Sequence, residues 1–172
     1  MNRTVLALVA TSVLGALGVS GCGPGSKGGP TISSKMNSPE LAPQVSPVVS
    51  ADILAREPIS NTATVKHILI SWKDLADSFG GRLDPRAEKR SKADAENEVR
   101  AVIKQLQDGA DFEAMMKAHS EDTGSAMSGR AFTVTPDAQL VIEFRQLSLR
   151  LRVGEFGVCQ SDFGFHIIKR VT

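Results

Sequence analysis

The segments Val65-Lys66-His67-Ile68-Leu69-Ile70 and Phe165-His166-Ile167-Ile168-Lys169 decide the fold of this 172-residue chain. Both are rich in β-branched residues, and each places a histidine in the middle of a predicted strand. Because side chains alternate along a strand, Val65, His67 and Leu69 are expected on one face. If the two segments pair, two rings that titrate near neutral pH share a low-dielectric setting, and their hydrogen bonds need partners.

The sequence between these strands predicts helices. Ser91 and Asp94 form a capping-box pattern, and apolar residues then recur at helical spacing until Gly109. Asp111 is expected to begin a short helix that runs through Ala118, and the polar run 120–125 to end it.

The last forty residues supply the remaining elements. We expect a short strand at 131–134, a helix from Thr135-Pro136 to Gly154, and a closing hairpin of 156–160 with 165–171, in which Gly164 permits a tight approach. The order strand, helix, helix, short strand, helix, strand, strand predicts an α+β domain with a small, mainly antiparallel sheet.

The first 21 residues have the pattern of a secretory signal. Arg3 precedes an apolar run from Val5 to Val19, which is shorter than the roughly 18 to 20 residues of a spanning helix. Val19-Ser20-Gly21-Cys22 resembles a bacterial lipobox, which implies that Cys22 carries lipid. The alternative is an ordinary signal peptide with a structural thiol at Cys22. The lipidated reading predicts a membrane anchor in the cell envelope facing the periplasm, with Gly23 weakly favouring the outer membrane; in an organism with one membrane, the anchor faces outward.

Residues 22–61 predict a flexible tether because they are rich in Gly, Pro and Ser and lack apolar periodicity. A short apolar patch, 51–55, is the one part suited to dock on the domain as a helical turn. The domain itself is expected at 62–172. Lipidation of Cys22 would leave Cys159 as the only thiol, so the domain is expected to rely on packing, with no disulfide.

The overall charge argues against polyanion binding. The chain has 20 basic and 19 acidic residues, a formal net charge of +1. No bulk field therefore favours nucleic acid, and binding is expected to be local and shape-driven.

Four ordered segments resemble a parvulin-type peptidyl-prolyl cis/trans isomerase domain. They are 65–70, 109–112, 120–126 and 163–169. The resemblance spans 62–172 and implies an FKBP-like fold, a four-stranded mainly antiparallel sheet with three to four helices. It also implies a monomer that uses no cofactor and no metal. Its partners would be proline-containing unfolded or extended polypeptides of the envelope or secreted fraction, and its activity isomerisation of their Xaa-Pro bonds.

The resemblance assigns roles to particular residues. The catalytic set would be His67, Asp122 and His166, and the proline pocket would be built from Ala131, Leu140, Phe144 and Phe163. Simpler interpretations stand beside these. The histidines could be a buried structural pair, Asp122 a turn residue, and Leu140 with Phe144 the ordinary core of an amphipathic helix.

The chain departs from the family pattern at one segment. Where parvulins commonly run Gly-Gly-Asp-Leu-Gly, this chain has Ser128-Gly129-Arg130-Ala131-Phe132. Ala131 therefore replaces a larger apolar wall residue, and Arg130 replaces a carboxylate. This departure favours a rival hypothesis, a non-catalytic tethered chaperone that holds extended chains. A third hypothesis, a metal site of two histidines and a carboxylate, lacks any recognised ligand spacing.

The basic loop Arg82–Lys92 has two interpretations. A phosphate-directed branch of the family uses basic residues in this region, but Asp74, Asp77 and Asp84 dilute the charge here. A solvated loop is therefore the favoured interpretation. Cys159 is expected to be a half-buried strand residue, since nothing near it indicates an activated thiolate.

Overall fold

The computed structural model describes residues 45–172, so the predicted signal sequence and Cys22 lie outside the described residues. The strands are β1 (Ala63–Ile70), β2 (Phe132–Val134), β3 (Phe156–Ser161) and β4 (Gly164–Arg170). The helices are α1 (Ala51–Leu54), the 3-10 helix η2 (Lys73–Phe79), α2 (Pro85–Glu88), α3 (Lys92–Gln107), α4 (Phe112–His119), α5 (Thr123–Ser128) and α6 (Ile142–Ser148). None of these helices has the length and apolar character needed to cross a bilayer.

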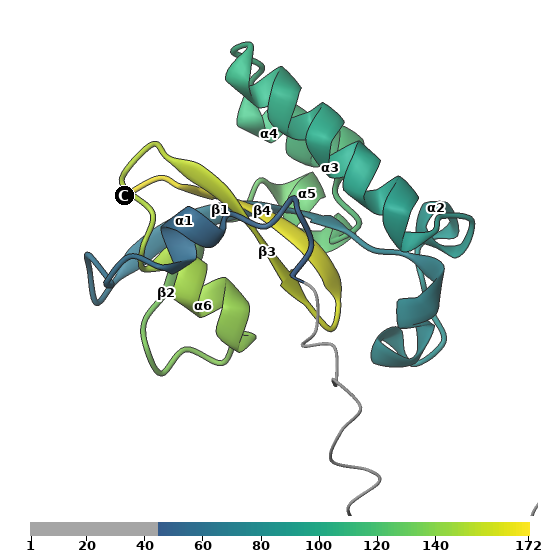
Figure 1. Cartoon of the computed structure of the whole chain (residues 1–172), viewed down its shortest axis with the longest axis horizontal. Helices are drawn as coiled ribbons and strands as arrows, with labels where there is room; N and C mark the ends of the chain where they lie inside the picture. Colours follow the sequence, from purple (N-terminus) through teal and green to yellow (C-terminus); the bar gives the residue numbers. More distant parts are fainter. Residues whose placement is uncertain (1–44) are drawn as a thin grey trace, which may run out of the picture. The chain divides into compact units, whose positions relative to one another are not determined.

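The four strands form one antiparallel sheet in the order β2-β1-β4-β3. The predicted pairing of the two histidine-containing segments is confirmed (Figure 1). His67 is opposite Ile168 and His166 is opposite Leu69. The two histidines are therefore diagonal neighbours on the same face of the sheet, as side-chain alternation requires.

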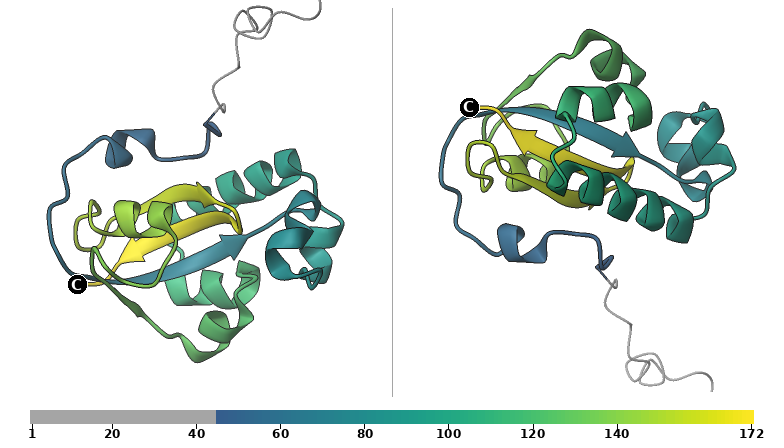
Figure 2. Two further views of the ribbon diagram at one scale, coloured as in Figure 1. Left: turned by 90° about the horizontal axis from the view of Figure 1, so that it is seen from below. Right: turned by 90° about the horizontal axis from the view of Figure 1, so that it is seen from above.

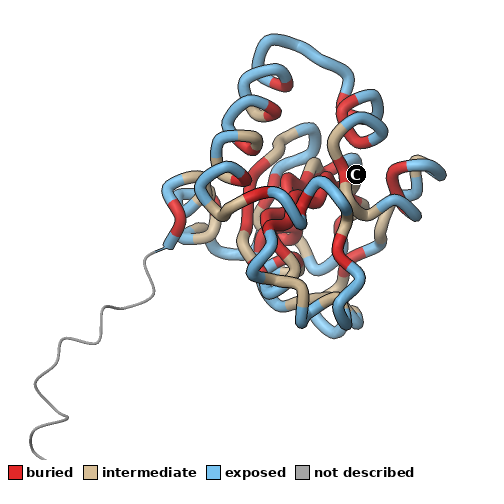
Figure 3. The backbone as a smooth tube through the Cα atoms, turned by 90° about the vertical axis from the view of Figure 1, so that its right-hand side faces the viewer, coloured by how far each residue is buried: buried red, intermediate tan, exposed pale blue. Residues whose placement is uncertain are grey.

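Helices cover both faces of the sheet (Figures 1 and 2). On one face, α3 and α4 pack on Ile68, Ile70 and Ile167. On the other face, α6 and α1 pack on Val65 and Ile168, next to the histidines. Among residues 45–172, buried positions gather in the sheet between these layers (Figure 3). The histidines therefore lie on the face of the sheet that α6 covers, beside the core that contains Val65 and Ile168.

The predicted helix starts at Ser91 and Asp111 are confirmed. Ser91 and Asp94 form the reciprocal capping box of α3, and the Asp111 carboxylate accepts a hydrogen bond of 2.8 Å from the Ala114 amide of α4. These caps satisfy amides that have no partner inside a helix. They fix the helices that cover the first face of the sheet.

Two polar segments are more helical than their composition indicates. The predicted loop after β1 contains η2 and α2, and Asp84 caps α2 with Pro85 in its first turn. The predicted breaker after α4 instead begins α5, with Asp122 as the N-cap. In both places an aspartate that reads as a turn residue caps a helix of one or two turns.

The third predicted helix begins later and ends earlier than expected. A start at Thr135-Pro136 is wrong, because α6 begins at Ile142 and ends at Ser148, well before Gly154. The Thr135 hydroxyl donates to the Asp137 carboxylate over 2.7 Å, which closes a local turn instead of a helix. Leu140 consequently precedes the helix, while Phe144 lies on it.

Residues 45–61 pack on the domain, where a flexible tether was expected. The Ser50 amide donates to the Val158 carbonyl over 2.9 Å, and the Ser50 hydroxyl accepts from the Val158 amide over 3.0 Å. Ile53 is buried in the core beside α6. Ser50 thereby supplies partners for the outer edge of β3, so the ordered unit begins before the expected boundary at residue 62.

Candidate active site

His67 and Asp122 contact each other directly across the start of α5. The ring nitrogen Nε2 of His67 lies 2.9 Å from Oδ2 of Asp122. The His67 side chain is 8% exposed, whereas that of Asp122 is 31% exposed. With Nε2 protonated, His67 donates to the carboxylate, so the buried ring is fixed by a group that itself reaches solvent.

Helix α5 holds the Asp122 carboxylate from the other side. The Ser125 hydroxyl donates to Oδ2 over 2.7 Å, and the Ser125 amide donates to Oδ1 over 3.3 Å. The hydrogen bond from His67, followed by those from Ser125, holds the pKa of Asp122 well below its usual range against the opposing effect of burial. Asp122 is therefore an ionised carboxylate at neutral pH.

His166 is bonded separately from His67. Its Nε2 atom lies 2.8 Å from the Ser161 hydroxyl, which also accepts a 3.1 Å bond from the Phe163 amide. The pKa of His166 is lowered to about 3, mainly by burial and to a lesser extent by the neighbouring His67, while Asp122 opposes this shift. At neutral pH the ring of His166 is uncharged.

Aromatic rings enclose the two imidazoles. The His67 and His166 ring centroids are 5.5 Å apart, and the Phe144 ring meets them edge-on at 5.2 Å and 5.5 Å. Phe132 adds a further contact at 5.1 Å from the His67 ring. The Nδ1 atoms of both histidines are buried with no hydrogen-bond partner among residues 45–172. The four rings form a largely buried floor, which we call the aromatic floor: His67, Phe132, Phe144 and His166.

Four of the seven predicted site residues lie together, and the other three lie outside that group. The structure brings His67, His166, Asp122 and Phe144 together, and Leu140 packs on the same core while remaining partly exposed. Ala131 is half-buried immediately before β2. The ring of Phe163 packs edge-on against Phe79 of η2 at 5.4 Å.

Three further residues belong to the site and were not singled out from the sequence. Ser125 follows Asp122 by three positions, the spacing at which a helix N-cap receives its hydrogen bond, so a capping pattern could have revealed it. Phe132 alternates with Val134 on the strand face that His67 shares. Ser161 carries no sequence signal, since only the β3–β4 register brings it beside His166.

Arg130 lies over the aromatic floor at its open edge. Its guanidinium carbon is 4.7 Å from the centroid of the Phe132 ring, and the residue is exposed. The site therefore combines aromatic and imidazole rings with one anionic side chain, Asp122, and one cationic side chain, Arg130, at its margin. Within residues 45–172, no cluster of three or more His, Cys, Asp and Glu side chains is arranged to hold a metal ion.

Such an arrangement is suited to binding a group with little net charge. The rings and their edges offer a largely buried apolar surface, and the ionised carboxylate offers acceptors at its rim. The one cysteine among residues 45–172, Cys159, is not an activated nucleophile. Burial raises the pKa of the Cys159 thiol, and this side chain is buried in the sheet.

Comparison with known proteins agrees with this geometry. The chain is 30% identical over 112 residues to the chaperone SurA of Saccharophagus degradans and 29% identical over 108 residues to the foldase PrsA of Geobacillus kaustophilus. These matches cover 64% and 62% of this chain, but only 23% of that SurA and 38% of that PrsA. The chain thus matches less than half the length of either relative.

Solved structures share the fold. The solution structure of TbPIN1 superposes with a TM-score of 0.56 at 22% identity, over 66% of this chain and all of that one. The peptidyl-prolyl isomerase ESS1 from Candida albicans gives a TM-score of 0.54 at 16% identity, over 65% of this chain and 63% of that chain. Residues 52–172 match the family described as the PPIC-type PPIase domain, which includes α1 as well as the sheet. The chain therefore belongs to the PPIC-type peptidyl-prolyl isomerase family and has the parvulin-like fold expected from its two histidine-containing strands.

Proposed function

We propose that this domain catalyses cis/trans isomerisation of Xaa-Pro bonds in unfolded or extended polypeptides. The observation that carries the proposal is the aromatic floor joined to an ionised Asp122 through His67. Rotation about the imide bond has a barrier of about 20 kcal/mol and breaks no covalent bond. The catalyst must only bind the twisted form more tightly than the planar one.

The aromatic floor favours the twisted form for a physical reason. Rotation removes amide resonance, so the twisted bond has less charge separation than the planar one. A buried surface of aromatic rings disfavours the charge-separated form, and a proline ring would pack beside it on the partly exposed Leu140. The histidines hold this geometry: both rings are buried, and each Nε2 atom is bonded inside the domain, that of His67 to Asp122 and that of His166 to Ser161.

Exchange NMR on Xaa-Pro peptides tests this proposal. The protein should accelerate the exchange, and Asp122→Ala and Phe144→Leu should each reduce the acceleration by about tenfold or more, since each removes part of the differential binding. The control is Lys104→Gln, which breaks an exposed ion pair with Asp108 on α3. An unaccelerated exchange with the folded parent protein would rule out the isomerase.

A non-catalytic chaperone is the second candidate, and the observation that favours it is the ring of Phe132. This ring lies against His67 and Phe144, in the segment where the family commonly has glycine. A filled site would bind chains without turning them over. In that case Phe132→Gly should create isomerase activity that the parent lacks, while the parent suppresses aggregation of a refolding client measured by light scattering. An active parent that loses activity in Phe132→Gly would contradict this candidate.

The envelope location is proposed on the sequence pattern at Cys22. Lipidation there would tether the domain to a membrane through residues 23–44, and its clients would be envelope or secreted polypeptides. Metabolic labelling with an alkyne-modified fatty acid should label the parent chain and leave Cys22→Ser unlabelled. Cys159→Ser is the matched control, because that thiol is buried in the sheet. Equal labelling of the parent and Cys22→Ser would refute the anchor.

A further inference from the structure

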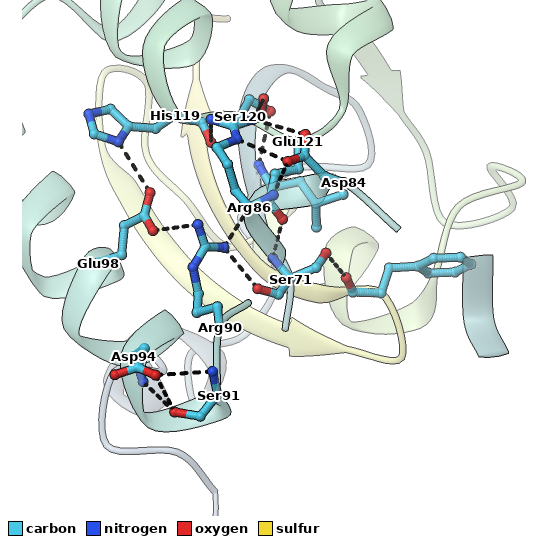
Figure 4. A network of polar contacts seen from close by, with 12 residues as sticks. Ser71, Asp84, Arg86, Arg90, Ser91, Asp94, Glu98, His119, Ser120 and Glu121 are labelled. Carbon is cyan, nitrogen blue, oxygen red and sulfur yellow. Dashed lines mark hydrogen bonds and ion pairs between the residues drawn. The ribbon is translucent and has the colours of Figure 1, made fainter. Parts of the chain in front are cut away.

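A charged network around Arg90 links the segment after β1 to α3 and to the connection after α4 (Figure 4). The Arg90 guanidinium donates to the Glu121 carboxylate over 2.5 Å and to the Ser71 carbonyl over 2.9 Å. Its other terminal nitrogen contacts the Glu98 carboxylate at 2.6 Å. The side chains of Arg90 and Glu121 are only 9% and 2% exposed, so both charges have left water.

This network joins the end of β1 to the connection between α4 and α5. Glu121 accepts a 2.6 Å hydrogen bond from the Ser71 amide, and its own amide donates to the Leu69 carbonyl over 2.9 Å. The Ser120 hydroxyl accepts from the Leu69 amide over 3.1 Å. Two residues of the connection are thus clamped to the strand that carries His67.

Arg86 holds the same connection from the solvent side. It donates to the Ser120 carbonyl over 3.0 Å and to the Ala118 carbonyl over 3.2 Å, at the end of α4. Asp84 orients the Arg86 guanidinium through contacts of 3.1 Å and 3.2 Å (Figure 4). The connection between α4 and α5 consists only of Ser120, Glu121 and Asp122. Each of its first two residues is therefore fixed, and Asp122 is the next residue along the chain.

Helix α5 is too weak to place Asp122 by itself. It has six residues, of which only Ser125 and Ala126 are buried. A helix of this length gains little from its own hydrogen bonds. Ser125 bonds the Asp122 carboxylate from α5, and on the other side the backbone of Asp122 continues from the fixed Glu121, about 3.8 Å away between α-carbons.

We propose that the Arg90–Glu121 ion pair positions Asp122 against His67, which makes Arg90 and Glu121 positioning residues for the site. Burying two charges is costly, and an apolar pair of similar volume would often serve stability equally well. The pair instead fixes the relative positions of three segments. The Arg90 guanidinium bonds the segment after β1, the connection between α4 and α5, and α3 at the same time. Its relevance to turnover rests on the proposed isomerase function, whereas its effect on Asp122 does not.

The decisive measurement is the titration of the Asp122 carboxyl by carbon-detected NMR, in the parent protein and in Glu121→Gln. The hydrogen bond from His67 is the main cause of the low pKa of Asp122. A misplaced Asp122 should lose part of that bond, so we expect its pKa to rise by about one pH unit in Glu121→Gln. Arg90→Lys keeps the charge but cannot bond all three acceptors, and it should raise the pKa in the same direction.

The control separates positioning from stability. Val102→Ala removes buried volume from α3 and should lower the melting temperature without moving the Asp122 titration. An unchanged Asp122 pKa in both folded network variants would overturn the proposal. If the parent accelerates Xaa-Pro exchange, the same variants should lose about tenfold in kcat with little change in KM, since the site is displaced and not removed. A parent without turnover would refute the isomerase, and the titration would still decide the positioning role.

Discussion

Gly164→Ala is expected to lower the free energy of unfolding by about 4 kcal/mol, close to the largest effects of single substitutions. Gly164 has a φ of +131°, a conformation that side chains of L-residues rarely adopt. A β-carbon built there would come within 2.6 Å of the Ile70 carbonyl oxygen and 3.0 Å of the Ser71 α-carbon. Backbone atoms of a central strand cannot move aside as a flexible side chain could.

The matched control is Gly109→Ala. Gly109 also has a positive φ, +97°, but no atom lies within 4 Å of the position of its added β-carbon. This substitution should therefore cost only the conformational strain, about 1 to 2 kcal/mol. Urea unfolding of both variants gives the comparison. Equal losses of stability would contradict the close approach of β4 to the end of β1.

The second large effect is a pH dependence of stability that depends on His166. The pKa of His166 is about 3 in the folded protein, against an ordinary value of 6.5 that we take for the unfolded chain. Between these two pH values the unfolded chain therefore carries a proton on this ring that the folded protein does not bind. Stability from the neutral ring is present in full above about pH 6.5 and is lost as the pH falls. Between about pH 6.5 and pH 4.5 this loss should reach about 2 to 3 kcal/mol.

Unfolding of the parent and of His166→Gln at each pH measures this effect. Carboxyl groups add their own slopes, so the difference between the two proteins is the informative quantity. His166→Gln should be less stable at neutral pH and show a shallower decline on acidification. Cys159→Ala is the control, because Cys159 lies opposite His166 in the register of β3 and β4 and is equally buried. Parallel pH profiles for the parent and His166→Gln would show that His166 is not held neutral.

The sequence alone predicts the elements whose signals are local. The alternation in Val65–Ile70 predicts β1, and the capping patterns at Ser91 and Asp111 predict the starts of α3 and α4. The requirement for glycine at position 164 also follows from the tight hairpin. These signals succeed because a strand face, a cap and a turn each depend on neighbours only a few residues apart.

Local patterns misjudge segments whose structure depends on distant contacts. The composition of residues 45–61 predicts a tether, yet Ser50 forms hydrogen bonds with Val158 of β3, 108 positions away in the sequence. The start of α6 is misplaced because Thr135 and Asp137 bond each other, so the turn competes successfully with the helix. Phe163 packs on Phe79, which belongs to a segment expected to be a loop.

The sequence determined the fold family and the pair of histidines at the centre of the site, because strand alternation alone places His67 and His166 toward one core once their strands pair. Only the tertiary structure decided what those rings touch. The diagonal register brings them within reach of Phe132 and Phe144, and the β3–β4 hairpin supplies Ser161. The clamp of Arg90 and Glu121 on the end of β1 is likewise tertiary, since its members come from separate segments. Side-chain direction and burial across such distances are set by packing, which no local pattern of residues encodes.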